Sequence, residues 1–201
     1  DGQKQFRLSA KIDELAYELR ERNILFVISA GNYNYSPESP EDKLTEYPNY
    51  ILSSEARICD PGTAALALTV GSLSTGNTPY RFDQDVPRRC IAGQSEYPSP
   101  FTRTGFGIDG MIKPDVVEFG GDEIFDKTGY GRDPGAGIPT TAKNFAPPEG
   151  RLFRTVFGTS FAAPAVSNIA ARLFDRFPGA SSNLIRALIV DSARVPVDRP
   201  G

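Results

Sequence analysis

Residues 157–166 read Phe-Gly-Thr-Ser-Phe-Ala-Ala-Pro-Ala-Val, a glycine turn that leads into an apolar, alanine-rich stretch. Gly158 allows the backbone to pass close to a group in front of Ser160, because glycine has no side chain and tolerates a positive φ. Apolar residues recur at helical spacing through Val166–Leu173. Pro164 is tolerated, because an N–H in the first helical turn has no intrahelical acceptor to lose. The stretch therefore predicts a buried helix whose first turn holds a hydroxyl.

From the residues alone, Ser160 is either an N-cap, the usual role of serine before an apolar helix, or a reactive group. The order Gly-Thr-Ser-Phe-Ala-Ala-Pro at 158–164 resembles the nucleophile signature of the subtilisin-like serine peptidases (subtilases), which reads Gly-Thr-Ser, a variable residue, a small residue, a variable residue and Pro. The resemblance implies that Ser160 is the catalytic nucleophile. The Gly-x-Ser-x-Gly elbow of α/β-hydrolases does not fit, because Ala162 occupies the position of the second glycine.

A second segment, Ile24–Ala30, is a continuous apolar run that predicts a strand buried on both faces of a parallel sheet. Gly31 and Asn32 follow it, and without further context they form an ordinary turn at a strand end. In the subtilases, the matching asparagine donates its side-chain amide to the oxyanion, and the backbone before it lines the pocket for the residue on the acyl side. The resemblance therefore implies that Asn32 is catalytic. It also places Ser29, Ala30 and Gly31 in the substrate-binding pocket.

Two further segments resemble the same family. Pro61–Leu73 holds a second apolar strand after Pro-Gly, and Lys113–Gly120 reads Lys-Pro-Asp followed by aliphatic residues, an acidic residue, an aromatic residue and glycine. The resemblance implies a cis peptide bond at Asp60–Pro61 and a place for Cys59 in the substrate-binding pocket. Together the four segments follow the order of the family and span nearly the whole chain.

The chain contains 201 residues, which suits one domain with a sizeable core, but it contains no histidine. A serine nucleophile needs a base within hydrogen-bond reach, and in subtilases that base is a histidine oriented by an aspartate. Both precede the oxyanion asparagine in the family. We therefore expect residues 1–201 to be the carboxy-terminal portion of one catalytic domain. The expected fold is α/β, a parallel sheet with flanking helices, as an incomplete form of the three-layer subtilisin-like fold.

The implied function is that of a serine endopeptidase acting on peptide or protein substrates through an acyl-enzyme on Ser160. The chain by itself is expected to be inactive, because base catalysis contributes about 10²–10⁴-fold and its base is missing. One alternative is a degenerate subtilase that binds peptides or proteins without cleaving them. Another is an unrelated α/β binding domain that matches the motifs by chance.

Charge and composition narrow the range of partners. A net charge of −3 and a pI of about 5.1 give no reason to expect nucleic acid or an anionic membrane, and no apolar run reaches the length of a membrane span. The polar start, Asp1–Gln5, is not a signal peptide; because a chain can begin inside a longer protein, this leaves the compartment unassigned. An apolar edge at Ile24–Ala30 predicts pairing with the missing amino-terminal part or a homodimer.

Metal binding receives little support from the sequence. With no histidine, the two cysteines do not indicate a zinc site. Carboxylates between Tyr33 and Tyr50 could hold calcium, but their spacing is not that of a calcium loop, so we expect a solvated loop and no cofactor. The carboxylates concerned are Glu38, Glu41, Asp42 and Glu46.

Three local patterns complete the interpretation. Ser9 is expected to cap a helix that ends near Leu19, and Ser181 or Ser182 to cap a last helix with Leu184, Ala187 and Leu188 facing inward. Gly121–Arg154 is rich in glycine and proline and is interpreted as a long surface excursion beside the substrate cleft. Gly105–Gly110 fits Gly-x-Gly-x-x-Gly, but no buried strand precedes it, so a nucleotide site is excluded.

Overall fold

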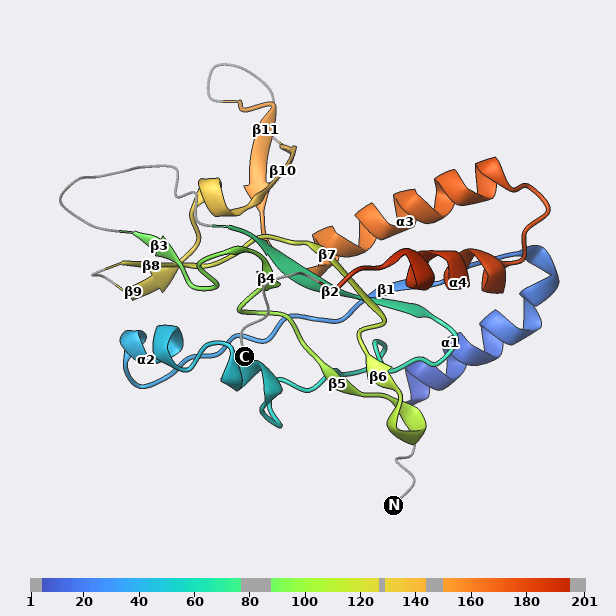
Figure 1. The fold of residues 1–201 in the computed structure, drawn as a ribbon, viewed down its shortest axis with the longest axis horizontal. Coiled ribbons are helices and arrows are strands. Elements are labelled where there is room, and N and C mark those ends of the chain that lie inside the picture. Colours follow the sequence, from blue (N-terminus) through green and yellow to red (C-terminus); the bar gives the residue numbers. More distant parts are fainter. Residues whose placement is uncertain (1–4, 77–87, 127–128, 144–149, 196–201) are drawn as a thin grey trace.

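A four-stranded sheet forms the centre of the molecule (Figure 1). The computed structural model describes residues 5–76, 88–126, 129–143 and 150–195. The strands β1 (Val27–Ser29) and β7 (Val116–Phe119) each run parallel to β2 (Leu68–Thr75), and β4 (Ser95–Pro98) pairs with the end of β2 in the antiparallel sense. The α/β class and the parallel sheet expected from the apolar runs are thus confirmed.

The long strand β2 is buried along most of its length, as its apolar run predicts. By contrast, β1 is shorter than the predicted strand Ile24–Ala30, and its residues are only half-buried. The prediction of burial on both faces was therefore wrong for β1. Among the described strands β1 pairs with β2 alone, so no described strand covers its second edge. The ladder continues for one residue beyond β1, where the N–H of Ala30 donates to the carbonyl of Val70 at 2.8 Å.

Two helices pack on one face of the sheet, where Figure 1 shows them side by side: α3 (Thr159–Arg176) and α4 (Ser182–Ser192). The small side chains of α3 let it approach β1, β2 and β7 closely, and burial of this apolar surface stabilises the fold. The core on this face consists of Leu68, Val70, Val116, Ala162, Ala163, Val166, Ala170, Ala180, Ile185 and Ile189. The prediction that this helix is buried was wrong for its outer side, where Ile169 is 41% exposed.

The remaining long helix, α1 (Arg7–Glu18), lies beside the segment Asp60–Leu66. Ser9 was expected to cap it, but Ser9 lies inside α1 and is fully buried. Its N–H and hydroxyl donate to the carboxylate of Asp60 at 2.7 and 2.6 Å. The prediction failed because the acceptor for the first turn comes from a distant segment instead of from the helix itself.

At α4, the side chain of Ser181 accepts a hydrogen bond from the N–H of Leu184 at 3.2 Å, so the predicted cap is confirmed. The predicted inward face of this helix was wrong by one position. Ile185 and Ile189 are buried, whereas Leu184, Ala187 and Leu188 are exposed. Apolar residues surround this helix on several sides, so their spacing alone does not fix which side meets α3.

The stretch Gly121–Arg154 is more regular than the expected excursion, because its described part contains four strands and a short 3-10 helix; residues 127–128 and 144–149 lie outside the described part. These elements are β8 (Ile124–Asp126), β9 (Gly129–Gly131), η4 (Pro134–Ala136), β10 (Ile138–Thr141) and β11 (Phe153–Val156). β8 pairs with β9 and with β3 (Arg89–Cys90), and β10 pairs with β11.

The smaller elements lie in the connections. They are η1 (Arg20–Arg22), α2 (Pro40–Thr45), η2 (Asn49–Leu52), β5 (Gly105–Phe106), η3 (Ile108–Gly110) and β6 (Ile112–Lys113). The expected cis peptide bond at Asp60–Pro61 is confirmed. Within the described part of the chain, no helix has the length and apolar character of a membrane span.

Candidate active site

The turn after β1 and the turn before α3 meet through Asn32 and Thr159. The Asn32 Oδ1 atom accepts hydrogen bonds from the backbone N–H and the hydroxyl of Thr159, at 3.0 and 3.2 Å. The Thr159 hydroxyl in turn accepts from the backbone N–H of Gly31 at 3.2 Å. Because Thr159 is fully buried, these bonds fix both turns against each other. The structure therefore brings Asn32 next to the residue that precedes Ser160.

Gly158 makes this close approach sterically feasible. Its φ is +136°, in the region that favours glycine, and a Cβ atom there would lie 3.0 Å from the Nδ2 atom of Asn32. The N–H of Gly158 donates to the carbonyl of Gly120 at 2.9 Å, which joins the turn to the end of β7. Gly120 is equally constrained, since a Cβ atom on it would lie 2.1 Å from the Ser72 hydroxyl oxygen. The turn is therefore packed so closely that neither position has room for a side chain.

Ser160 is exposed in the first turn of α3, and Asn32 is exposed as well. First-turn N–H groups have no intrahelical acceptor. The N–H of Thr159 donates to Asn32 and that of Phe161 to the carbonyl of Gly158 at 3.0 Å, whereas that of Ser160 has no partner among the described residues. A hydroxyl and a free N–H therefore lie together at a helix N-terminus, where negative charge is favoured.

The residues predicted to line the substrate pocket are partly brought together. Gly31 has a φ of +93°, and the thiol of the exposed Cys59 lies 3.8 Å from the position that a Gly31 Cβ atom would take. Ser29 ends β1 and is half-buried. Ala30 is only 1% exposed, so its methyl group belongs to the core and only its backbone can contact a ligand. The pocket role of these residues remains a prediction.

Sequence reasoning missed Arg103, which lies against the same backbone. Its Cδ atom is 3.1 Å from the position of a Gly31 Cβ atom, and its Nε donates to the carbonyl of Asn32 at 3.1 Å. Its Nη1 donates to the carbonyls of Glu55 and Arg57 at 2.9 and 2.8 Å. Arg103 thus joins the asparagine turn to the segment that carries Cys59. In the sequence it is one charged residue in a polar stretch, which gives no signal of this role.

Comparison with known proteins gives the family of this chain. The chain matches the Subtilase family over residues 2–200. It belongs to the subtilase family. It is 42% identical over 203 residues to the uncharacterized protein y4bN of Sinorhizobium fredii (strain NBRC 101917 / NGR234), across 98% of this chain and 46% of that protein. The fold resembles that of a protease from Pseudoalteromonas arctica PAMC 21717, with a TM-score of 0.54 and 16% identity, across 96% of this chain and 42% of the other. This subtilase chain therefore spans less than half the length of both proteins.

A buried acid lies close to the serine turn of this subtilase, two residues beyond Gly120. The Asp122 carboxylate accepts hydrogen bonds from the Ser74 hydroxyl and from the N–H groups of Glu123 and Ala92, at 2.7 and 3.4 Å for the two amides. Burial raises the pKa of Asp122 to about 7, although these three donors favour the carboxylate. All its contacts are with the surrounding scaffold, so Asp122 is not positioned as a base for Ser160.

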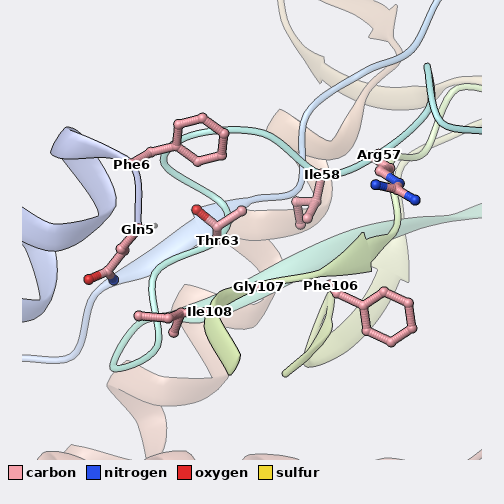
Figure 2. A pocket seen from close by; sticks show the side chains of 8 residues that line it. All are labelled: Gln5, Phe6, Arg57, Ile58, Thr63, Phe106, Gly107 and Ile108. Atoms are coloured by element: carbon pink, nitrogen blue, oxygen red, sulfur yellow. The ribbon is translucent and has the colours of Figure 1, made fainter. Parts of the chain in front are cut away.

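A cavity of about 390 Å³ lies beside the start of α1 in this subtilase (Figure 2). Figure 2 shows Phe6 and Gln5 before α1, Arg57, Ile58 and Thr63 around the Cys59 segment, and Phe106–Ile108 below them. None of the predicted site residues lines this cavity. It is therefore separate from the predicted substrate pocket.

The carboxylates considered for calcium do not converge in this subtilase. Glu41 lies in the first turn of α2 and accepts a hydrogen bond from Ser39, and Glu46 accepts one from Tyr35. Across residues 5–76, 88–126, 129–143 and 150–195, no group of three or more carboxylate or thiol side chains is placed to hold a metal ion.

Proposed function

We propose that this chain carries the nucleophile and the oxyanion-binding groups of a serine endopeptidase that cleaves peptide bonds through an acyl-enzyme. The subtilase family is a family of serine peptidases, and the finer assignment rests on one observation. The side chain of Asn32 is hydrogen-bonded to Thr159, directly before Ser160. An amide and a hydroxyl that are far apart in sequence are thereby available to the same reacting carbonyl.

In this mechanism Ser160 attacks the carbonyl carbon of the scissile bond, and the oxygen of the tetrahedral intermediate becomes negatively charged. The Oδ1 atom of Asn32 is engaged by Thr159, so its Nδ2 group is left to donate to this oxygen. The free N–H of Ser160 is the second donor. A preorganised amide donor of this kind is worth about 3–4 kcal/mol, a magnitude that comes from subtilisin itself.

The mechanism also needs a base that takes the serine proton and returns it to the leaving amine. The chain has no histidine, so we propose that the histidine and its aspartate come from an amino-terminal part of the same domain. The attachment point that we propose for that part is the edge of β1 that pairs with no described strand. An open groove beside this edge offers apolar surface; it is lined by Leu25, Phe26, Val27, Ser167, Ala170, Ala171 and Phe174.

A fluorophosphonate probe tests the assignment in the full-length protein. We expect rapid covalent labelling, with mass spectrometry placing the adduct on Ser160, and no labelling of the Ser160→Ala variant. The separately expressed 201-residue chain is expected to react negligibly, because it lacks the base. Absence of labelling in the folded full-length protein would support the alternative, a degenerate, non-catalytic subtilase that binds peptides or proteins.

Sedimentation tests the proposed attachment at β1. We expect the separate chain to form dimers or larger species through the exposed edge, and the full-length protein to show no such association. A separate chain that stays monomeric at high concentration would contradict the attachment. It would leave the assignment of Ser160 untouched.

A further inference from the structure

A buried ion pair connects two segments that lie outside the central sheet. The Nζ atom of Lys43, on α2, lies 2.7 Å from Oε2 of Glu123, and their side chains are only 1% and 9% exposed. The same Nζ atom lies 4.0 Å from the ring centroid of Tyr130, on β9. The lysine is therefore enclosed by a carboxylate on one side and an aromatic face on the other. We call this arrangement of Lys43, Glu123 and Tyr130 the clasp.

The clasp is a poor stabiliser by its chemistry. Neither the Lys43 Nζ atom nor the Glu123 Oε2 atom makes a further hydrogen bond to the described residues. Removal of two charges from water carries a large desolvation penalty, and a buried pair without additional hydrogen bonds regains little of it beyond its own attraction. Apolar residues of similar volume would be expected to stabilise this contact at least as well. The pair therefore needs an explanation other than stability.

The position of the clasp provides one. The segment 33–50, which carries Lys43, begins directly after Asn32. The segment 121–131, whose described part carries Glu123 and Tyr130, begins after Gly120, whose carbonyl accepts the N–H of Gly158 in the serine turn. The Tyr130 hydroxyl also donates to the Ser36 hydroxyl oxygen at 3.0 Å. Figure 1 shows α2 next to β8 and β9 at one end of the molecule.

Each segment is anchored to the scaffold independently of the clasp. The hydroxyl groups of Tyr47 and Tyr50 donate to the carbonyls of Pro98 and Pro100 at 2.6 and 2.9 Å. Asp122 anchors the other segment through its bonds to Ser74 and Ala92 described above. Neither segment needs the clasp to remain attached, so the specific effect of the clasp is on the position of one segment relative to the other.

We propose that Lys43 and Glu123 are positioning residues of the peptidase site, which hold segment 33–50 and the described residues 121–126 and 129–131 together as one wall against which a substrate peptide lies. The proposal rests on the proposed function, because it assigns the wall to the site formed by Asn32 and Ser160. The partner of the wall is an extended peptide chain of the substrate. Neither Lys43 nor Glu123 contacts the reacting atoms.

The test compares a buried apolar pair with a matched control in the full-length protein. Lys43→Met/Glu123→Leu removes both charges, whereas Lys11→Met/Glu14→Leu makes similar changes at an exposed pair on α1. We expect the clasp variant to keep or raise its melting temperature, but to show a KM at least about 10-fold higher for fluorescein-labelled casein, with kcat changed less. The control variant should match the wild type in both respects.

Amide hydrogen exchange gives a readout that does not depend on catalysis. In the clasp variant we expect faster exchange in segments 33–50 and 121–131, with β2 unchanged. Wild-type exchange in both segments, or a KM that changes only together with the melting temperature, would overturn the proposal. If the wild type cleaves no casein, the proposed function fails, and the exchange comparison still judges whether the clasp positions the two segments.

Discussion

The side-chain oxygen of Asn32 is held by two donors of a single residue, the N–H and the hydroxyl of Thr159. These bonds orient the whole amide, because an amide whose oxygen is fixed presents its Nδ2 group in one direction only. The orientation is built before any substrate arrives. Such preorganisation is the feature on which the first two predictions depend.

Replacement of Asn32 by aspartate should lower kcat of the full-length protein by about 10²–10³-fold, the range for loss of one oxyanion donor in subtilisin. The aspartate retains an acceptor for Thr159, but it places an oxygen where Nδ2 now lies. KM should change little, since the lost interaction forms only in the transition state. Steady-state kinetics check this, with Asn183→Asp on the exposed surface of α4 as control. A loss below about threefold would mean that Asn32 is not an oxyanion donor.

Thr159→Val should reduce kcat, whereas Thr159→Ser should retain most of it. Valine preserves the volume of the buried side chain but loses the hydroxyl that donates to Asn32 and accepts from Gly31. Each lost hydrogen bond is worth about 1 kcal/mol, and the N–H of Gly31 would be left without its partner. Kinetics and thermal unfolding of the two variants, measured together, check the prediction. Equal kcat values for Thr159→Val and Thr159→Ser would show that the hydroxyl does not orient Asn32.

Gly158→Ala should impair both stability and activity. A Cβ atom at this position would lie 3.0 Å from Asn32 Nδ2, and the positive φ of 136° strains any residue with a side chain. Gly93→Ala separates the two causes, because Gly93 also has a positive φ, of 72°, but no atom lies within 4 Å of the place that its Cβ atom would take. We expect strain of about 1–3 kcal/mol in both variants by denaturant unfolding, and loss of activity only in Gly158→Ala. Comparable activity in the two would disprove the steric contact with Asn32.

The elements that the sequence predicted best are those specified by local residues. The glycine turn before Ser160 and the apolar run of β2 are examples. Gly158 is the residue type that a positive φ requires, and the apolar run of β2 by itself indicates a buried strand. The contact of Asn32 with the serine turn was reached only through the family resemblance. Nothing in the spacing of the two segments indicates it.

Charged residues were the least predictable. Lys43 occurs among the carboxylates of a polar stretch, where a solvated loop is the natural interpretation, yet it is buried against Glu123. Ser9 has the residue type of a cap but serves as a buried donor to Asp60, at a sequence separation of 51. In each case the deciding group comes from a segment far along the chain. Local sequence patterns therefore do not predict such partners.

The last prediction concerns Asp122 and the dependence of stability on pH. Burial raises the pKa of this carboxyl from 3.8 to about 7 in the folded protein. Between these values the folded state keeps a proton that the unfolded state releases, so folding is coupled to proton uptake. The contribution to stability is therefore full below about pH 4, declines as the pH rises and is lost above about pH 7. The decline amounts to at most about 4 kcal/mol, at about 1.4 kcal/mol per pKa unit.

Asp122→Asn should remove this decline. The asparagine side chain can still accept from the N–H of Glu123 and donate to the Ser74 hydroxyl, and it carries no charge at any pH. Urea unfolding at about pH 5 and about pH 8, on either side of the raised pKa, measures the effect: part of the decline is already complete at the lower pH, so the stability of the variant should exceed that of the wild type by about 2–3 kcal/mol more at the higher pH than at the lower. Asp109→Asn is the control, because Asp109 is exposed and its φ of 52° suits asparagine. A difference between wild type and Asp122→Asn that is the same at both pH values would show that Asp122 does not titrate in this range.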